Sequence, residues 1–223
     1  ALWPLLFLPY EYFHPDIMEY YGSINILKAG VVFSDAVTTV SPSYALEIQT
    51  PEFGAGLDGF LRSFSRKLTG IVNGIDTRVW DPLNDGSIAH SFSAEDLSGK
   101  AVCKRDLQQR LSLKKNDGPL FGLIGRLVDQ KGIDLVISIM DDIIALGAQV
   151  AVLGSGDSRY EQDLRSLSAR HKGNLGVVIG FDEDLAHSIE AGADFFLMPS
   201  RFEPCGLNQM ISMRYGTLPI VTR

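Results

Sequence analysis

From residue 119 onward, short runs of apolar residues alternate with segments in which apolar residues recur at helical spacing. Runs that are apolar throughout are typical of parallel strands buried on both faces. The pattern therefore predicts an α/β fold in which helices cover both faces of a parallel sheet. The expected strands are residues 120–125, 149–154, 175–180, 194–198 and 218–221, and the expected helices are residues 132–140, 160–171, 184–191 and 207–215.

The first half of the chain is less regular. Residues 36–41 and 69–73 are expected to form strands, with a helix over residues 43–49 between them. Residues 81–118 are polar and carry several turn signals around a charged helix expected over residues 98–111.

These patterns predict two domains. Residues 1–116 are assigned to the C-terminal part of a first domain together with an inter-domain connection, and residues 117–223 to a second domain. Both ends of the sequence are expected to be cut within a domain, so the first domain is expected to be incomplete and the second truncated at its C-terminus.

Charge and cysteine content exclude several classes of function. The 223 residues carry a net charge of −7, which argues against nucleic acid or an anionic membrane as partner. The two cysteines, Cys103 and Cys205, lack the spacing of a disulfide framework or a zinc site. The apolar start is too short to span a bilayer. A neutral polymer or a small anion remains a suitable ligand.

The segment from Gly125 to Gly132 follows an expected strand and carries two cations, Arg126 and Lys131. Loops beyond the carboxyl ends of parallel strands are where ligands bind, and a guanidinium can grip a diphosphate with two hydrogen bonds. The alternative, which the pattern alone favours, is a solvated loop with two exposed cations.

Two further segments follow expected strands. Gly154-Ser155-Gly156 is expected to be a tight turn, and either a fold-maintaining turn or a phosphate contact explains it. Glu203 lies just before an expected helix at residues 207–215, where its carboxylate can cap the helix or bind sugar hydroxyls. The residue pattern alone favours capping.

Asn73 and the histidines carry weaker indications. Asn73-Gly74 is typical of a turn, although the Asn73 amide can also bind a hydroxyl-rich ligand. The four histidines share no spacing with a nucleophile, so neither an acyl-transfer triad nor a metal cluster is expected. His187 is expected on a helix surface.

Several segments together resemble the ADP-glucose-dependent glycogen and starch synthases. These are retaining glucosyltransferases of the GT-B type, with an active site between two Rossmann-like domains. The stretches that carry the resemblance are Lys28-Ala29-Gly30, Val37 to Pro42, Glu47 to Glu52, Gly70 to Asp76, and Pro199-Ser200-Arg201-Phe202-Glu203-Pro204-Cys205-Gly206-Leu207.

The resemblance implies a role for each candidate residue. Arg126 and Lys131 would bind the diphosphate and stabilise the leaving ADP, and Glu203 would hold sugar hydroxyls. The remaining substrate-binding residues would be Asn73, Gly154, Phe181, Cys205, Gly206 and Leu207. The donor would be ADP-glucose and the acceptor an α-1,4-glucan, with no metal or other cofactor, in a bacterial cytoplasm or a plastid stroma.

Some features of the family are absent from the sequence. Neither the Lys-Thr-Gly-Gly-like phosphate loop nor the histidine of the first domain is present, and the Thr-Gly-Gly-Leu-like loop expected after Arg223 is missing. This polypeptide alone is therefore expected to bind the donor without turning it over. The alternatives are a related transferase or phosphorylase with another donor, and a non-catalytic nucleotide- or glucan-binding protein that keeps the fold.

Overall fold

The computed structural model describes residues 3–222 and separates into two compact units, which comprise residues 1–73 and 74–223. We call them unit 1 and unit 2. Residues 74–116, which were predicted to belong to the first domain and its connection to the second, belong to unit 2 by their contacts.

Unit 1 is built from short elements. In chain order they are η1 (Trp3–Leu6), η2 (Tyr10–Tyr12), β1 (Glu19–Tyr20), β2 (Ser23–Ile24), α1 (Ile26–Phe33), β3 (Val37–Thr39), α2 (Pro42–Glu47), α3 (Asp58–Ser63), η3 (Ser65–Lys67) and β4 (Leu68–Gly70), where η denotes a 3₁₀ helix. Strands β1 and β2 pair antiparallel, and β3 pairs with β4 in parallel. The two strands and the helix predicted here are confirmed, although both strands are shorter than expected.

The start of α2 explains why β3 ends where it does. Ser41 accepts a hydrogen bond from the Tyr44 backbone N–H, and Pro42 occupies the first turn, so the chain leaves the strand directly into a capped helix. Gly70 of β4 lies against this corner: a Cβ there would be 2.1 Å from the Ser41 carbonyl oxygen. Only glycine permits this approach.

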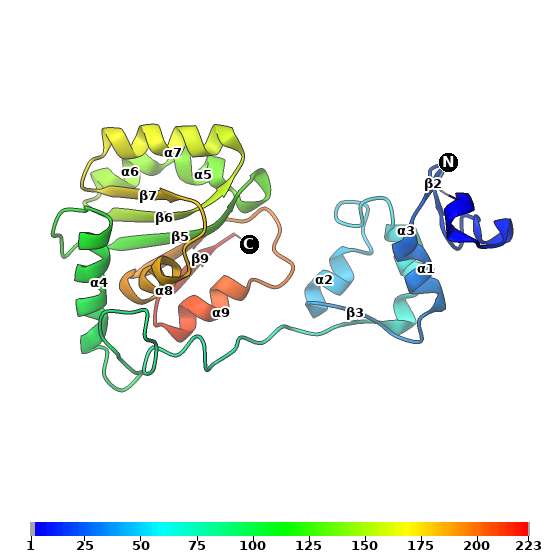
Figure 1. Cartoon of the computed structure of the whole chain (residues 1–223), viewed down its shortest axis with the longest axis horizontal. Coiled ribbons are helices and arrows are strands. Elements are labelled where there is room, and N and C mark those ends of the chain that lie inside the picture. Colours follow the sequence, from blue (N-terminus) through cyan, green and yellow to red (C-terminus); the bar gives the residue numbers. More distant parts are fainter. Residues whose placement is uncertain (1–2, 223) are drawn as a thin grey trace. The chain divides into compact units, whose positions relative to one another are not determined.

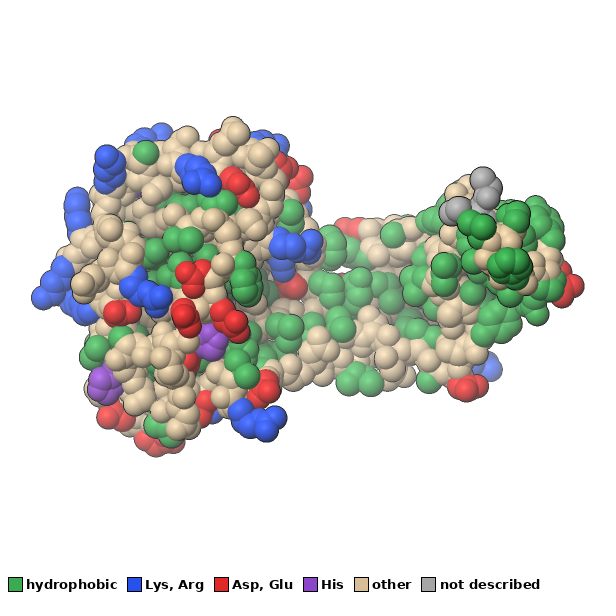
Figure 2. Space-filling model, in the orientation of Figure 1, with side chains coloured by type: hydrophobic (Ala, Val, Ile, Leu, Met, Phe, Trp, Pro, Cys, Tyr) green, Lys and Arg blue, Asp and Glu red, His purple; other side chains and the backbone are tan. Residues whose placement is uncertain are grey.

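Apolar side chains cover much of the surface of unit 1 in the view of Figure 2. Phe7 and Tyr21 are 93% and 83% exposed, whereas Met18, Val31 and Ala45 are buried. The core of this unit is therefore small.

Unit 2 contains a five-stranded parallel sheet with helices on both faces (Figure 1). Its elements are α4 (Ser98–Arg110), β5 (Leu120–Leu127), η4 (Asp129–Lys131), α5 (Ile133–Ser138), α6 (Met140–Ala145), β6 (Gln149–Gly156), α7 (Ser158–Arg170), β7 (Leu175–Ile179), α8 (Glu183–Gly192), β8 (Phe195–Met198), α9 (Leu207–Arg214) and β9 (Leu218–Val221). The parallel sheet predicted from the sequence is confirmed. Across residues 3–222, no helix is long and apolar enough to cross a membrane.

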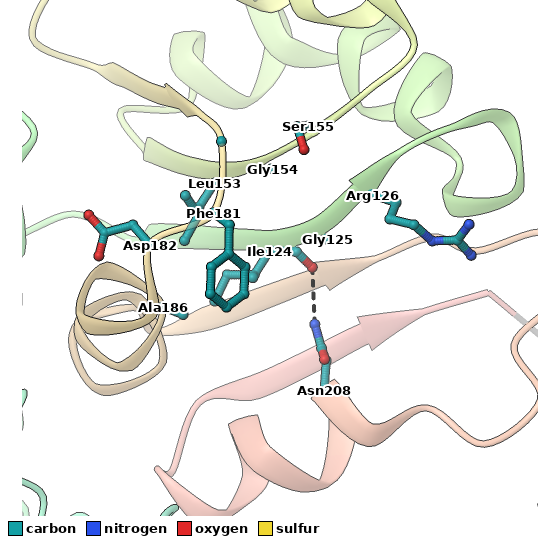
Figure 3. Close-up of a pocket in the computed structure, with 11 residues that line it drawn as sticks. Ile124, Gly125, Arg126, Leu153, Gly154, Ser155, Phe181, Asp182, Ala186 and Asn208 are labelled. Carbon is teal, nitrogen blue, oxygen red and sulfur yellow. Dashed lines mark hydrogen bonds between the residues drawn. The ribbon is translucent and has the colours of Figure 1, made fainter.

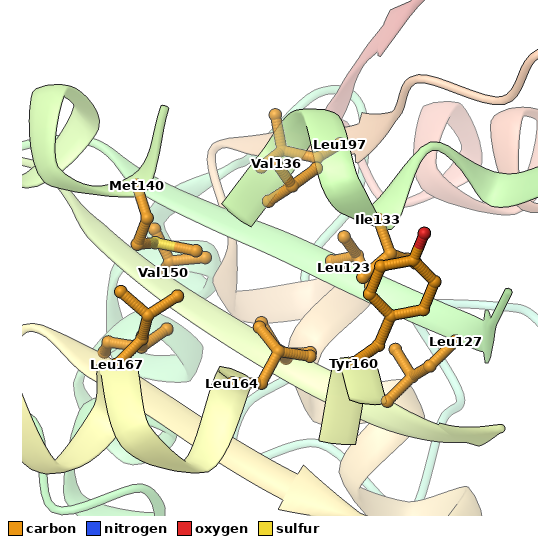
Figure 4. Close-up of a cluster of buried hydrophobic side chains, with 12 residues drawn as sticks. Leu123, Leu127, Ile133, Val136, Met140, Val150, Tyr160, Leu164, Leu167 and Leu197 are labelled. Atoms are coloured by element: carbon orange, nitrogen blue, oxygen red, sulfur yellow. The ribbon is translucent and has the colours of Figure 1, made fainter. Parts of the chain in front are cut away.

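The core lies on both sides of this sheet. Helices α5 to α7 pack on one face over side chains such as Leu123, Val150 and Val152 (Figure 4). Helices α4 and α8 pack on the other face, over Leu120 and Ala151 among others. Neighbouring residues of one strand thus serve opposite cores, which is why the strands read as continuous apolar runs.

The structure differs from the sequence prediction at the ends of two strands. β5 and β6 continue to Leu127 and Gly156, so Arg126 lies on a strand and the glycine-rich stretch is no turn. Glycine allows this pairing, because a Cβ on Gly154 would lie 2.0 Å from the Gly125 carbonyl oxygen. The helix predicted over residues 132–140 is also broken, at Ile139, into α5 and α6.

The strand order is β7-β6-β5-β8-β9. The chain builds outward from β5 through β6 to β7 and then returns to place β8 on the other side of β5. Ligands in open α/β sheets bind at such a reversal, beyond the carboxyl ends of the two central strands. The loops that follow β5 and β8 are therefore the place to look for a site.

Candidate functional site

Two loops meet at the carboxyl ends of β5 and β8. We call residues 128–132 the β5 loop and residues 199–206 the β8 loop. Lys131 of the first donates to the carboxylate of Glu203 in the second, with 2.5 Å between Nζ and Oε2. Ser200 donates to the same oxygen at 3.0 Å. The structure thus pairs two residues that the sequence singled out separately.

Glu203 does not cap helix α9. The helix begins at Leu207, its N-cap residue is Gly206, and no side chain bonds to its first turn in the way a cap does. Gly206 adopts a left-handed conformation with φ of 74°, which favours glycine. The capping interpretation is therefore wrong, because the turn at Gly206 replaces the cap and Glu203 faces Lys131. The first backbone N–H groups of α9, from Leu207 on, remain suited to bind an anion.

A pocket of about 260 Å³ lies beside these loops (Figure 3). It is formed by the ends of β5 and β6, the turn after β7, and helices α8 and α9. Its lining residues are Ile124, Gly125, Arg126, Leu153, Gly154, Ser155, Gly180, Phe181, Asp182, Ala186 and Asn208. Three of the predicted site residues, Arg126, Gly154 and Phe181, therefore share one pocket.

Arg126 and Phe181 have little to hold them in place. Arg126 is exposed, and the one hydrogen bond that its guanidinium donates within residues 3–222 is a long one of 3.4 Å to Gln130 Oε1. Within residues 3–222, no carboxylate forms an ion pair with Arg126. Phe181 is 91% exposed. A guanidinium and an aromatic ring are thus both accessible to a ligand that enters this pocket.

Asn208 is a pocket residue that was not predicted from the sequence. Its Nδ2 donates to the Ile124 carbonyl oxygen at 3.0 Å, which ties the first turn of α9 to the end of β5 (Figure 3). Its position directly after Leu207, in the first turn of the expected helix, was the available indication.

The remaining predicted residues are placed as follows. Cys205 is half-buried in the β8 loop, directly before Gly206, and Leu207 is 42% exposed. Asn73 is exposed and follows β4 at the end of unit 1. The residues brought together are those of unit 2, and the role of Asn73 stays a prediction.

His187 lies in the interior, so the prediction of a surface histidine was wrong. Its Nδ1 lies 2.7 Å from Asp85 Oδ2, and its ring stacks on Trp80 with 4.0 Å between ring centroids. The segment around Asp85 covers this side of α8, which the sequence pattern gave no reason to expect. In the described part of the chain, no group of three or more His, Cys, Asp or Glu side chains could hold a metal ion.

Comparisons with known proteins identify the family of this chain. The family model "Starch synthase catalytic domain" matches residues 1–63, and "Glycosyl transferases group 1" matches residues 104–223. Glycogen synthase of Halorhodospira halophila is 51% identical over 220 residues, which are 99% of this chain and 46% of that protein. Glycogen synthase of Paracidovorax citrulli is 56% identical over 92% of this chain and 40% of its own length. The chain thus spans about half the length of these curated relatives, or less.

A solved structure of a starch synthase is also similar to this chain. The catalytic domain of starch synthase IV from Arabidopsis thaliana, bound to ADP and acarbose, is similar with a TM-score of 0.90 and 40% identity. The match covers 95% of this chain and 44% of that one. The predicted resemblance and the predicted GT-B fold class are both confirmed.

Proposed function

This chain belongs to the group 1 glycosyl transferases, and we propose that it is part of a glucosyltransferase that transfers glucose from ADP-glucose to an α-1,4-glucan. In this proposal, unit 2 binds the ADP-glucose. The observation that carries the proposal is the meeting of Lys131 and Glu203 at the strand-order reversal. Around it lie an accessible guanidinium, that of Arg126, and the N-terminus of α9. A cationic group and free amides beside a carboxylate suit a ligand that has both phosphates and hydroxyls.

Lys131 and Arg126 would bind the diphosphate. Breaking the glycosidic bond of a nucleotide sugar builds negative charge on the departing phosphate oxygen, and fixed cations lower the free energy of that transition state. Gly206 and Leu207, at the start of α9, would add backbone amides to the same phosphates.

The sugar and the base would occupy the remaining positions. Glu203 would accept hydrogen bonds from glucose hydroxyls, and Asn73 would be a further sugar-binding residue. Phe181 and Gly154 line the pocket, and they would lie near the adenine and the phosphates respectively. Cys205 would support the β8 loop. Transfer with retention requires no covalent nucleophile when the acceptor attacks on the face from which ADP departs, so the protein's task is positioning and charge stabilisation.

The named ligands of one relative support this choice of donor and acceptor. The starch synthase IV structure, 40% identical, is bound to ADP and acarbose. The two similar glycogen synthases come from bacteria, which favours the bacterial cytoplasm over the plastid stroma for this chain.

Calorimetric titration with ADP tests the proposal. We expect specific binding by the chain, and at least a roughly tenfold loss of affinity in an Arg126→Ala, Lys131→Ala double variant. An Arg165→Ala, Lys172→Ala variant removes the same charge from exposed positions of unit 2 and should bind ADP like the wild type. Equal affinity in all three proteins, or no binding by the wild type, would contradict the proposed donor site.

A further inference from the structure

Arg201 of the β8 loop contacts the β5 loop at several points. Its backbone N–H donates to the Gln130 carbonyl oxygen at 2.8 Å, and its Nη1 donates to the Asp129 carbonyl oxygen at 2.5 Å. The guanidinium also forms a two-pronged pair with Asp134, with Nη1 to Oδ1 at 2.8 Å and Nη2 to Oδ2 at 2.6 Å. One side chain thus binds both the β5 loop and the first turn of α5.

These contacts bracket Lys131. Gln130 directly precedes it, and α5 begins just beyond the Gly132 that follows it. The backbone at Gly132 lies directly against the β8 loop, because a Cβ there would lie 2.1 Å from the Pro199 carbonyl oxygen. Gln130 adds a side-chain hydrogen bond of 3.3 Å to the Phe202 carbonyl oxygen. The backbone that carries Lys131 is therefore held against the β8 loop on both sides.

The charges in this group are mutually satisfied. The hydrogen bonds from Arg201 lower the pKa of the Asp134 carboxyl, which stays ionised at neutral pH. The Asp129 side chain is occupied from elsewhere, since Tyr160 and Arg159 both donate to its Oδ1. Arg201 is thus committed to Asp134 and to backbone oxygens, and a planar guanidinium can make such a set of bonds where an ammonium cannot.

We propose that Arg201 is a positioning residue that locks the β5 loop to the β8 loop and so fixes the backbone from which Lys131 reaches the donor site. It acts through Lys131, and this consequence for ligand binding rests on the donor site proposed above. The side chains of Arg201 and Asp134 are 45% and 40% exposed, and exposed ion pairs contribute little to the free energy of unfolding. Loss of Arg201 should therefore alter the site more than the stability.

A double-mutant cycle measures whether Arg201 acts through Lys131. Arg201→Gln should weaken ADP binding roughly tenfold in the wild-type chain. In a Lys131→Ala background the same substitution should change the affinity less than about twofold, because the residue being positioned is gone. Equal losses in both backgrounds would show that Arg201 acts on the ligand directly or through the fold, and would overturn the proposal.

Two further variants separate geometry from charge. Arg201→Lys keeps the charge but cannot form the two-pronged pair, so it should lose nearly as much affinity as Arg201→Gln. Asp134→Asn tests the same pair from the other side, should Arg201→Gln fail to fold. Arg170→Gln, which removes an exposed arginine paired with Asp141, is the matched control. If Arg201→Lys bound ADP with the wild-type affinity, Arg201 would act only through its charge at long range, and the proposed positioning of Lys131 would be excluded.

Amide hydrogen exchange tests the lock without a ligand. In Arg201→Gln, amides of both loops should exchange faster, including that of Gly132, while the amides of β6 keep their protection. Unchanged exchange in both loops would overturn the proposal even if ADP binding failed altogether. Faster exchange in a chain that does not bind ADP would instead uphold the lock and contradict only the proposed donor site.

Discussion

The ammonium group of Lys131 lies 2.5 Å from a carboxylate oxygen of Glu203, within the site proposed to receive a diphosphate. The side chains are 25% and 23% exposed, so both remain accessible to a ligand. A phosphate that binds Lys131 must compete with Glu203 for the same donor, and it also meets the negative charge of the carboxylate. The pair therefore opposes ADP binding as long as no sugar engages Glu203.

Glu203→Gln should consequently bind ADP more tightly, by roughly two- to fivefold, since it removes the competing charge of a partly exposed pair. The gain for ADP-glucose should be smaller, because the carboxylate proposed to accept hydrogen bonds from the sugar is lost. Calorimetry with both ligands measures the two changes. Glu95→Gln, at an exposed position of unit 2, is the control for charge alone. Weaker binding of ADP by Glu203→Gln would show that the pair does not oppose the phosphate.

Gly154→Ala should destabilise the protein by about 1–3 kcal/mol, as expected for a group forced into a closely packed site. The new Cβ would lie 2.0 Å from the Gly125 carbonyl oxygen, which belongs to the backbone of the neighbouring strand and cannot move aside cheaply. Gly86→Ala is the matched control, because nothing lies within 4 Å of a Cβ there. Urea unfolding of both variants gives the comparison, and equal stabilities would mean that β5 and β6 separate readily at their ends.

The elements of the sheet could be predicted from the sequence because their signal is local. The strands of unit 2 contain continuous apolar runs, and helices such as α7 have an apolar period of their own. The ends of β5 and β6 could not be predicted this way, since they depend on how closely Gly154 and Gly156 approach the partner strand. The break between α5 and α6 at Ile139 could not be predicted either, because the apolar period of the sequence continues across it.

The candidate site was predicted as separate loops, and their pairing is a tertiary result. Nothing local indicates that Lys131 and Glu203 form an ion pair, because they are brought together only by the position of β8 beside β5. His187 shows the opposite error. The face of α8 that carries His187 is buried only because the irregular segment around Asp85 covers it. Irregular segments leave no periodic signal in the sequence.

The carboxyl group of Glu190 in α8 is buried, and its hydrogen-bonding capacity is not fully satisfied. Its Oε2 has no hydrogen-bond partner in residues 3–222, and burial raises its pKa well above the ordinary value. The charge of Lys100 partly offsets this effect, and the pKa of Lys100 is itself lowered by burial to about 8. The Lys100 ammonium bonds instead to the Ala191 and Tyr215 carbonyl oxygens and to the Thr217 hydroxyl.

Glu190→Gln should therefore remove a pH dependence of stability. Above the ordinary pKa of 4.5 the unfolded chain releases the Glu190 proton while the folded protein keeps it, so the free energy of unfolding falls as pH rises towards the raised folded pKa. The slope due to this group is at most about 1.4 kcal/mol per pH unit. Urea unfolding between about pH 5 and pH 8 should show a flatter profile and higher neutral-pH stability for Glu190→Gln than for the wild type. Glu183→Gln, at an exposed position of the same helix, is the control and should keep the wild-type slope of stability against pH. If Glu190→Gln also kept the wild-type slope, the buried Glu190 carboxyl would be ionised in the folded protein.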